Sequence, residues 1–461
     1  MTYSTPGLRR ELGKWDLTAY GTNSVIGVSV FILPAQVAAQ FGNWSALAFL
    51  GVGLASLSVA LCFAELASRF DRTGGPYLYA RAAFGRFVAF EMGWLQWFTR
   101  VTSTASIANG VALTLGFYWP AMTHGIGRAA LITALTLLFG WINMRGIRES
   151  ALTINLFTIC KLVPLVLFIG VGCWFIDADQ LSELGPVSLT QFSTGALLLT
   201  FAFAGYDVIG VPAGEAADPR RHVPFAIVGT IVAALAVMTL VQVVAMGTLP
   251  DISASSTPLA DASHRFMGSI GGLLVTIGAF VSMTGTMMGT LLGGPRILFA
   301  MAENGELPKF LARIHPRYAT PANAIMFSTA LALVLGLSGS FVVLAVASAI
   351  GRLVLYTVTC AATLQLRRAR FQGVVAPATF TAPLGSLLPV VAIAASLIIL
   401  VGATTPQLVG GTAALGAGAL LFATSDQLAR RRARAALASV ASGPAPVDLY
   451  DEPSVRRSKQ G

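Results

Sequence analysis

Runs of about 20 consecutive apolar residues recur along almost the whole length of this 461-residue chain, with polar connections between them. A helix of that length spans the hydrocarbon core of a bilayer, so each run predicts a transmembrane helix. Only 11% of the residues are charged, against about 25% in a soluble domain. The sequence therefore predicts an all-α integral membrane protein whose main solvent is lipid.

Twelve spans are expected, with boundaries that are good to a few residues. Their approximate limits are 17–40, 45–69, 87–116, 128–149, 151–176, 191–213, 223–249, 267–300, 322–339, 341–366, 384–404 and 407–428. The chain then divides into an amino-terminal segment (1–16), a twelve-helix domain (17–428) and a polar carboxy-terminal tail (429–461), for which the composition predicts disorder.

Basic residues fall almost entirely into alternate connections. One side of the membrane receives clusters that include Arg9, Arg69, Arg145, Arg220, Arg313, Arg367 and Arg430. The connections on the other side carry mainly acids, among them Asp177, Asp179, Glu183, Asp251 and Asp261. By the positive-inside rule both termini are cytoplasmic, and the net charge of +10 is an orientation signal at the membrane surface rather than a sign of nucleic-acid binding.

The residues that commonly carry enzyme chemistry are dispersed. The four cysteines lie in apolar segments without CxxC spacing, the four histidines are scattered, and no HExxH, GxSxG or P-loop pattern occurs. A membrane enzyme would need a clustered His/Asp or metal set near one membrane face. We therefore expect neither an enzyme nor a bound cofactor or metal.

Asparagine, serine and glycine crowd the middle of the first span, and the residues predicted to bind substrate there are Ile26, Gly27, Val28 and Ser29. If the helix unwinds near Gly27, the half-helix that follows presents free N–H groups and a positive dipole end, which suit a carboxylate. Broken helices of this kind mark the substrate sites of secondary transporters. The alternative is that glycine and serine only allow close helix packing.

The sixth span holds a second glycine break. Phe201, Ala202 and Phe203 precede Gly205, and Asp207 follows it. Carbonyl groups ahead of such a break would accept hydrogen bonds from an ammonium group, and Phe201 would close over the ligand as an aromatic lid. The alternative makes both phenylalanines ordinary packing residues.

Three charged residues lie deep in predicted spans. Lys161 is ten residues into the fifth span, roughly 15 Å from its start, where burial favours the neutral amine and allows a proton to be loaded and released; a permanent strut is the alternative. Arg100 and Asp207 are expected to pair across a cavity, or one of them is expected to bind a charged group of the substrate. The alternative is that they form a purely structural salt bridge. Glu65 and Arg352 are assigned to interfacial or packing roles.

Several motifs occur in the same order as in one transporter family. They are Gly27-Val28-Ser29-Val30-Phe31-Ile32-Leu33-Pro34, Glu65-Leu66-Ala67 with Gly74-Gly75-Pro76-Tyr77-Leu78-Tyr79, Gly214-Glu215 with Asp218-Pro219-Arg220 and Pro224, and Arg296 with Asn304-Gly305-Glu306-Leu307-Pro308 and Pro321. In these stretches the chain resembles the amino acid–polyamine–organocation (APC) transporters, especially bacterial amino acid permeases, over about residues 10 to 430.

The resemblance implies a LeuT-type five-plus-five inverted repeat, residues 17–176 against 191–366, with two peripheral helices at 384–428 and with helices one and six discontinuous. It implies a substrate site between helices one, three, six, eight and ten. Phe157-Thr158-Ile159-Cys160-Lys161 is similar to the pattern of proton-coupled members, in which the lysine ammonium replaces a sodium ion and faces the first break and hydroxyls here assigned to Ser282 and Thr286. One departure is that Gly27-Val28-Ser29 stands where the family usually has Gly-Ser-Gly.

The function expected from these features is secondary active transport of an amino acid by alternating access, coupled to protons, across the bacterial inner membrane. The expected partners are the amino acid, protons and the lipid bilayer. An amino acid/polyamine exchanger or an organic-cation carrier is the first alternative, and a channel would need a continuous polar pore lining. The identity of the amino acid, the direction, the stoichiometry and the oligomeric state stay open.

Overall fold

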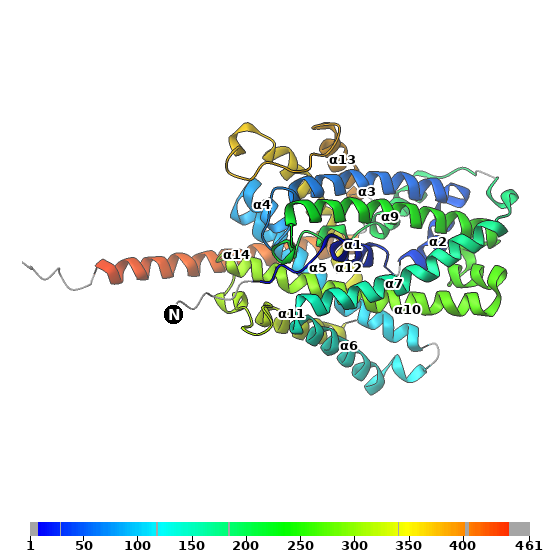
Figure 1. Cartoon of the computed structure of the whole chain (residues 1–461), viewed down its shortest axis with the longest axis horizontal. Coiled ribbons are helices and arrows are strands. Elements are labelled where there is room, and N and C mark those ends of the chain that lie inside the picture. Colours follow the sequence, from blue (N-terminus) through cyan, green and yellow to red (C-terminus); the bar gives the residue numbers. More distant parts are fainter. Residues whose placement is uncertain are drawn as a thin grey trace, which may run out of the picture.

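The computed structural model describes residues 8–27, 29–116, 119–182, 185–339, 341–401 and 405–441. Its α-helices are α1 (Lys14–Val25), α2 (Ser29–Phe41), α3 (Ser45–Ala67), α4 (Pro76–Phe84), α5 (Arg86–Gly116), α6 (Gly125–Arg145), α7 (Ile147–Gly172), α8 (Leu189–Ala202), α9 (Pro219–Thr248), α10 (Pro258–Glu303), α11 (Ala322–Ser338), α12 (Phe341–Leu366), α13 (Leu387–Val401) and α14 (Thr405–Ala441). Within these ranges the chain forms no β-strand, and most helices lie in one bundle along a common direction (Figure 1). The predicted all-α class is confirmed.

Helices suit this sequence because each satisfies its own backbone hydrogen bonds where water is absent. Six described helical segments are long and apolar enough to cross a membrane, and Pro219–Thr248 reaches a mean hydropathy of 2.4. On α7, Leu156, Ile159 and Val166 are exposed, and their spacing puts them on one face that fits lipid. The opposite face of the same helix is buried and carries Lys161.

Each predicted span corresponds to helix in the structure, with differences at particular ends. The first span is two helices, α1 and α2, and only the first part of the sixth is an α-helix, α8. Helix α10 begins nine residues before the predicted 267, because Gly268 (φ 66°) joins a further segment to it at a kink. Helix α4, in the connection after the second span, was not predicted. Helix α14 continues to Ala441, so helix replaces the disorder predicted for 429–441, and 442–461 lie outside the described residues.

The packing of the helices follows an internal two-fold repeat. Helix α7 packs on α10, and the equivalent helices of the other half, α12 and α5, pack on each other in the same way. Likewise α1 packs on α9, and its counterpart α8 packs on α3. Helices α3 and α9, which are also counterparts, run side by side (Figure 1). The fold is therefore the five-plus-five arrangement expected of an APC-type transporter, with α13 and α14 added outside it.

The start of α1 and the far end of α14 lie at the same end of the bundle (Figure 1). There the backbone N–H groups of Glu11 and Leu12 both donate to the carbonyl of Glu215, at 2.9 Å. We call this end of the bundle the terminal end. The even number of spans that the sequence predicted requires this arrangement.

Buried ion pairs hold the terminal end together. Arg296 on α10 pairs with Glu215 and donates to Asn143 Oδ1 at 3.0 Å, so it joins α10 to α6 and to the segment after α8. The Tyr77 hydroxyl donates to Glu306 Oε2 at 2.8 Å. Burial raises the pKa of the Glu306 carboxyl above its ordinary value, while the hydrogen bond from Tyr77 and the charges of two neighbouring arginines act in the opposite direction. Burial outweighs these partners, so the ionised form of Glu306 is less favoured than that of an exposed carboxyl.

A third network joins α3 to α12. Glu65, which is buried, accepts hydrogen bonds from Arg367 Nε at 2.9 Å, from Arg69 Nη2 at 3.4 Å and from the Ala382 backbone N–H at 2.9 Å. The sequence-based assignment of Glu65 to a packing role agrees with these contacts.

We predict that Arg367→Gln lowers the stability of the purified protein by about 1–3 kcal/mol, because it leaves a buried carboxylate with a weaker set of partners. Arg368→Gln is the matched control, since Arg368 is exposed. Thermal unfolding in detergent measures both. Equal losses for the two variants would contradict the assignment of this stability to the Glu65 pair.

Candidate substrate and proton site

The first break lies where α1 gives way to α2. Helix α1 ends at Val25, and Ile26 has a non-helical backbone (φ −78°, ψ 74°) before α2 begins at Ser29. Val28, predicted to bind substrate, lies outside the described residues. The regular helical pattern thus ends at this point, as the sequence predicted: the Ile26 N–H still makes a helical hydrogen bond, whereas the Gly27 N–H donates to the Val25 carbonyl at 2.8 Å.

The second break follows α8. The helix ends at Ala202, and after Phe203 and Ala204 the chain turns at Gly205, whose φ of 130° favours glycine. A short 3₁₀ turn over Tyr206–Val208 continues the chain. A Cβ atom built on Gly205 would lie 2.8 Å from the Ser24 carbonyl oxygen, so the two breaks touch.

A cavity of about 140 Å³ lies between the two breaks. Five segments that correspond to helices one, three, six, eight and ten supply its wall. The wall residues are Ser24, Val25, Gly27 and Ser29 at the first break, Arg100, Ser103, Ser106 and Ile107 on α5, Phe201, Ala204 and Gly205 at the second break, Thr286 and Thr290 on α10, and Arg352 on α12. These are the helices that the resemblance implied.

The residues predicted to bind substrate fall into two groups. Gly27, Ser29, Phe201 and Gly205 line the cavity. The Phe201 side chain is 48% exposed although it lies inside a bundle, which is consistent with a ring facing open space.

Three others lie behind the wall. Ile26, Ala202 and Phe203 are buried, and none is among the residues that line the cavity. Phe203 packs edge-on against Phe49, with ring centroids 6.3 Å apart. The side chains of these three residues thus pack inside the protein, and substrate binding by their peptide groups stays a prediction, but the Ile26 carbonyl has a further role.

That role is to accept a hydrogen bond from Lys161. The Lys161 ammonium is fully buried and donates to the carbonyl oxygens of Asn23 at 3.0 Å, Ile26 at 3.1 Å and Ser282 at 3.5 Å. Ser282 Oγ also donates to the Ile26 carbonyl, at 3.4 Å. Thr286 Oγ1 donates to the carbonyls of Asn23 at 3.3 Å and Ser282 at 2.8 Å. The structure thus brings Lys161, Ser282 and Thr286 together on the free carbonyls of the first break.

Arg100 and Asp207 form a direct ion pair between α5 and the second break, and both side chains are buried. Asp207 also accepts from Gln96 Nε2 at 3.3 Å and from the Tyr356 hydroxyl at 3.4 Å. The Arg100 guanidinium thus balances the charge of the Asp207 carboxylate, and the two neutral donors add hydrogen bonds to it. Besides pairing with Asp207, Arg100 also lines the cavity.

On the sequence alone, Arg352 is assigned to an interfacial or packing role, and the structure places it elsewhere. It lines the cavity, and its guanidinium lies 5.5 Å from the Phe201 ring centroid. Its Nη2 donates to Ser103 Oγ at 3.3 Å. The only sequence signal for this position was that it lies in the tenth span, one of the helices implied to form the site.

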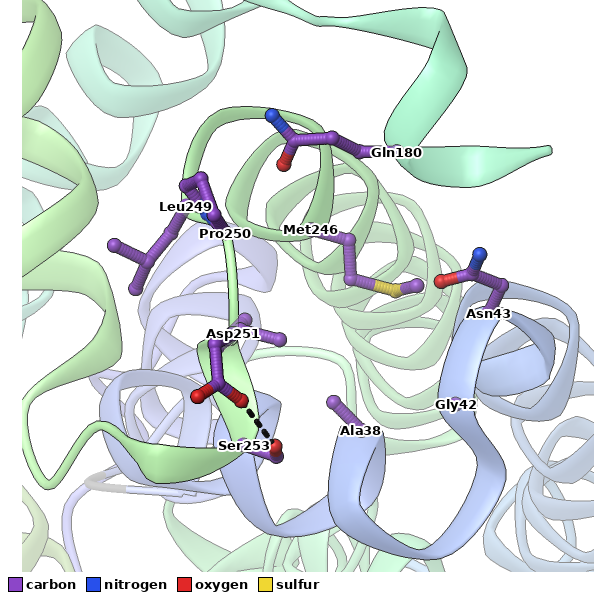
Figure 2. A pocket seen from close by; sticks show the side chains of 10 residues that line it. Ala38, Gly42, Asn43, Gln180, Met246, Leu249, Pro250, Asp251 and Ser253 are labelled. Atoms are coloured by element: carbon purple, nitrogen blue, oxygen red, sulfur yellow. Dashed lines mark hydrogen bonds between the residues drawn. The ribbon is translucent and has the colours of Figure 1, made fainter. Parts of the chain in front are cut away.

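A larger pocket, of about 350 Å³, lies at the opposite end of the bundle between the end of α2 and the connection 249–253 (Figure 2). Its carboxylate, Asp251, accepts a hydrogen bond from Ser253 at 3.0 Å. The pocket is lined by the ends of α2 and α9 and by the connections near them, and no residue of the two helix breaks is part of its described wall. We assign the site to the central cavity for that reason.

Comparison with known proteins agrees with this geometry. The sequence model of the amino acid permease family matches residues 12–421. The chain belongs to the amino acid permease family. The permease is 29% identical over 413 residues to the serine/threonine exchanger SteT of Bacillus subtilis, covering 86% of this chain and 91% of that protein.

Two further relatives are also transporters. The branched-chain amino acid permease BcaP of Bacillus subtilis is 28% identical over 361 residues, which cover 73% of this chain and 76% of that protein. A transporter of Mycobacterium tuberculosis is 33% identical over 366 residues, covering 78% and 81%. These relatives confirm the APC resemblance, and they make this permease a multi-pass membrane transporter rather than an enzyme.

Proposed function

We propose that this permease carries an amino acid across the bacterial plasma membrane by alternating access, in symport with protons. The observation that carries the proposal is the contact between the two helix breaks beside the central cavity. The N–H groups at the start of α2, with the positive end of its helix dipole, suit the α-carboxylate, and the carbonyl groups at the end of α8 suit the α-ammonium group. A zwitterion matches both.

Proton coupling is supported by the position of Lys161. Its ammonium contacts the carbonyls of Asn23 and Ile26, which belong to the first break. A change in its protonation would alter the hydrogen bonding of the same segment that binds the substrate. Such a shared element links proton binding and substrate binding to one conformational equilibrium.

Cytoplasmic termini are supported by the distribution of basic residues. Arg69, Arg220 and Arg367 follow or precede spans at the terminal end, where cytoplasmic loops are expected to gather Lys and Arg. The opposite connections carry Asp177 and Asp251 instead. The terminal end is therefore assigned to the cytoplasm.

Amino acid exchange is the second candidate function, because the relative SteT is a serine/threonine exchanger and matches 86% of this chain. Exchange would use the same cavity, with return of the empty carrier replaced by return of a loaded one. It differs from symport in needing substrate on both sides of the membrane.

Purified protein in liposomes tests both candidates. A panel of labelled amino acids is offered with an inside-alkaline pH gradient, with a sodium gradient and with no gradient, to vesicles that are empty or preloaded with the same amino acid. Symport predicts concentrative uptake into empty vesicles with the pH gradient alone. Uptake only into preloaded vesicles would establish exchange, and no uptake under any condition would refute amino acid transport.

A further inference from the structure

The cavity wall carries an uncompensated positive charge. Two guanidinium groups, Arg100 and Arg352, line the cavity, and the ion pair to Asp207 uses Arg100. The described wall residues otherwise have serine, threonine, glycine or apolar side chains. Val28, the undescribed residue between the wall residues Gly27 and Ser29, is uncharged in the sequence.

Among the described residues, Arg352 has few hydrogen-bond partners. Its contacts are a hydrogen bond to Ser103 at 3.3 Å and the face of Phe201 at 5.5 Å. Its buried Nε has no hydrogen-bond partner in the described part of the chain. A guanidinium offers five N–H donors in a planar fork, so most of this group's capacity is open to a ligand.

A buried cation inside a membrane protein is costly unless an anion accompanies it. A neutral amino acid brings one positive and one negative charge, so the net positive charge at the cavity stays the same. A cationic amino acid or a polyamine adds a like charge next to Arg352. Only a substrate with a net negative charge offsets the positive charge of the cavity wall.

Resting on the function proposed above, we propose that the substrate of this permease is an amino acid with an acidic side chain, whose second carboxylate binds Arg352. The two helix breaks hold the α-carboxylate and the α-ammonium group, and the planar fork of Arg352 binds the side-chain carboxylate through paired N–H donors. The small cavity, about 140 Å³, suits a molecule of this size.

Selectivity of the unmodified protein is the first test. L-Aspartate and L-glutamate are compared with L-asparagine and L-glutamine, which differ from them by one amide in place of a carboxylate, and with L-lysine. Ligand-induced thermal stabilisation and competition against labelled uptake both measure affinity. The acids are expected to bind about 10- to 100-fold more tightly than their amides, as for an ion pair in a buried site, and lysine is expected not to compete.

Substitution of the guanidinium is the second test. Arg352→Gln is expected to remove the preference for the acid, so that the ratio of acid affinity to amide affinity falls to about one. Arg352→Lys keeps the charge without the fork and is expected to keep part of the preference. Arg265→Gln, which removes an exposed positive charge from α10, is the control and is expected to keep the full preference.

The outcomes separate this inference from the proposed function. If neutral amino acids are carried and the acids are not, or if Arg352→Gln keeps the full acid preference, the inference is overturned while the transport function stands. If the panel shows no uptake of any amino acid, the function itself is overturned. Should Arg352→Gln fail to fold, the selectivity of the unmodified protein still decides between an acidic and a neutral substrate.

Discussion

Gly205→Ala is expected to stop transport. The φ of 130° at Gly205 is one that other residues rarely adopt, and an added Cβ atom would lie 2.8 Å from the Ser24 carbonyl oxygen and 3.1 Å from the Val25 nitrogen. These are backbone atoms and cannot rotate away as a side chain would. One of the two breaks must therefore shift, and displacement of reacting or binding groups by about 1 Å costs roughly a hundredfold in rate.

The matched control is Gly51→Ala on α3. Gly51 has a helical backbone, and a Cβ there meets nothing within 4 Å. Both variants are reconstituted at equal protein amounts, and initial uptake of the best substrate from the liposome panel is measured. Transport by Gly205→Ala at the rate of Gly51→Ala would show that contact between the two breaks is not needed, which removes the basis of the proposed site.

The sequence was informative about the fold because the signals were local. A run of about 20 apolar residues is a helix in lipid whatever its neighbours are. Gly27 and Gly205 interrupt such runs, so both breaks could be located before their contact was known. Helix α4 carries no comparable signal, since a nine-residue helix in a connection has neither the length nor the hydropathy of a span.

The wall of the cavity was harder to predict, because it depends on which face of each helix turns inward. Phe203 and Phe201 are two residues apart in one apolar stretch, yet the first packs on Phe49 and the second faces the cavity. Arg352 looked interfacial by its place in the span, but the packing of α12 on α5 turns it toward Ser103. Only packing between helices distant in sequence decides such directions.

Lys161 was predictable for the opposite reason. A lysine in the middle of a lipid-facing helix is so costly that it must face the protein interior, whatever the details of packing. Its spacing from the exposed Leu156, Ile159 and Val166 gives the same direction. What the sequence did not contain is that its three acceptors are all backbone carbonyls.

Lys161→Ala is expected to abolish accumulation driven by a pH gradient. The substitution leaves the carbonyls of Asn23 and Ile26 at the first break without their ammonium donor. The carrier then has no proton to bind and release at this position, so the inside-to-outside ratio of substrate is expected to fall to about one, the value for an uncoupled carrier. Exchange of labelled for unlabelled substrate is expected to persist, because it does not require a proton to cross.

A second variant distinguishes coupling from a purely structural role. Lys161→Arg keeps a permanent positive charge and donors near the same carbonyls but cannot release its proton. A proton-coupling role predicts that this variant also loses accumulation, whereas a structural strut predicts that it keeps accumulation. Lys309→Ala removes an exposed lysine outside the spans and serves as the control. Full pH-driven accumulation by either Lys161 variant would exclude this lysine as the proton carrier, and coupling would then have to rest on another group or be absent.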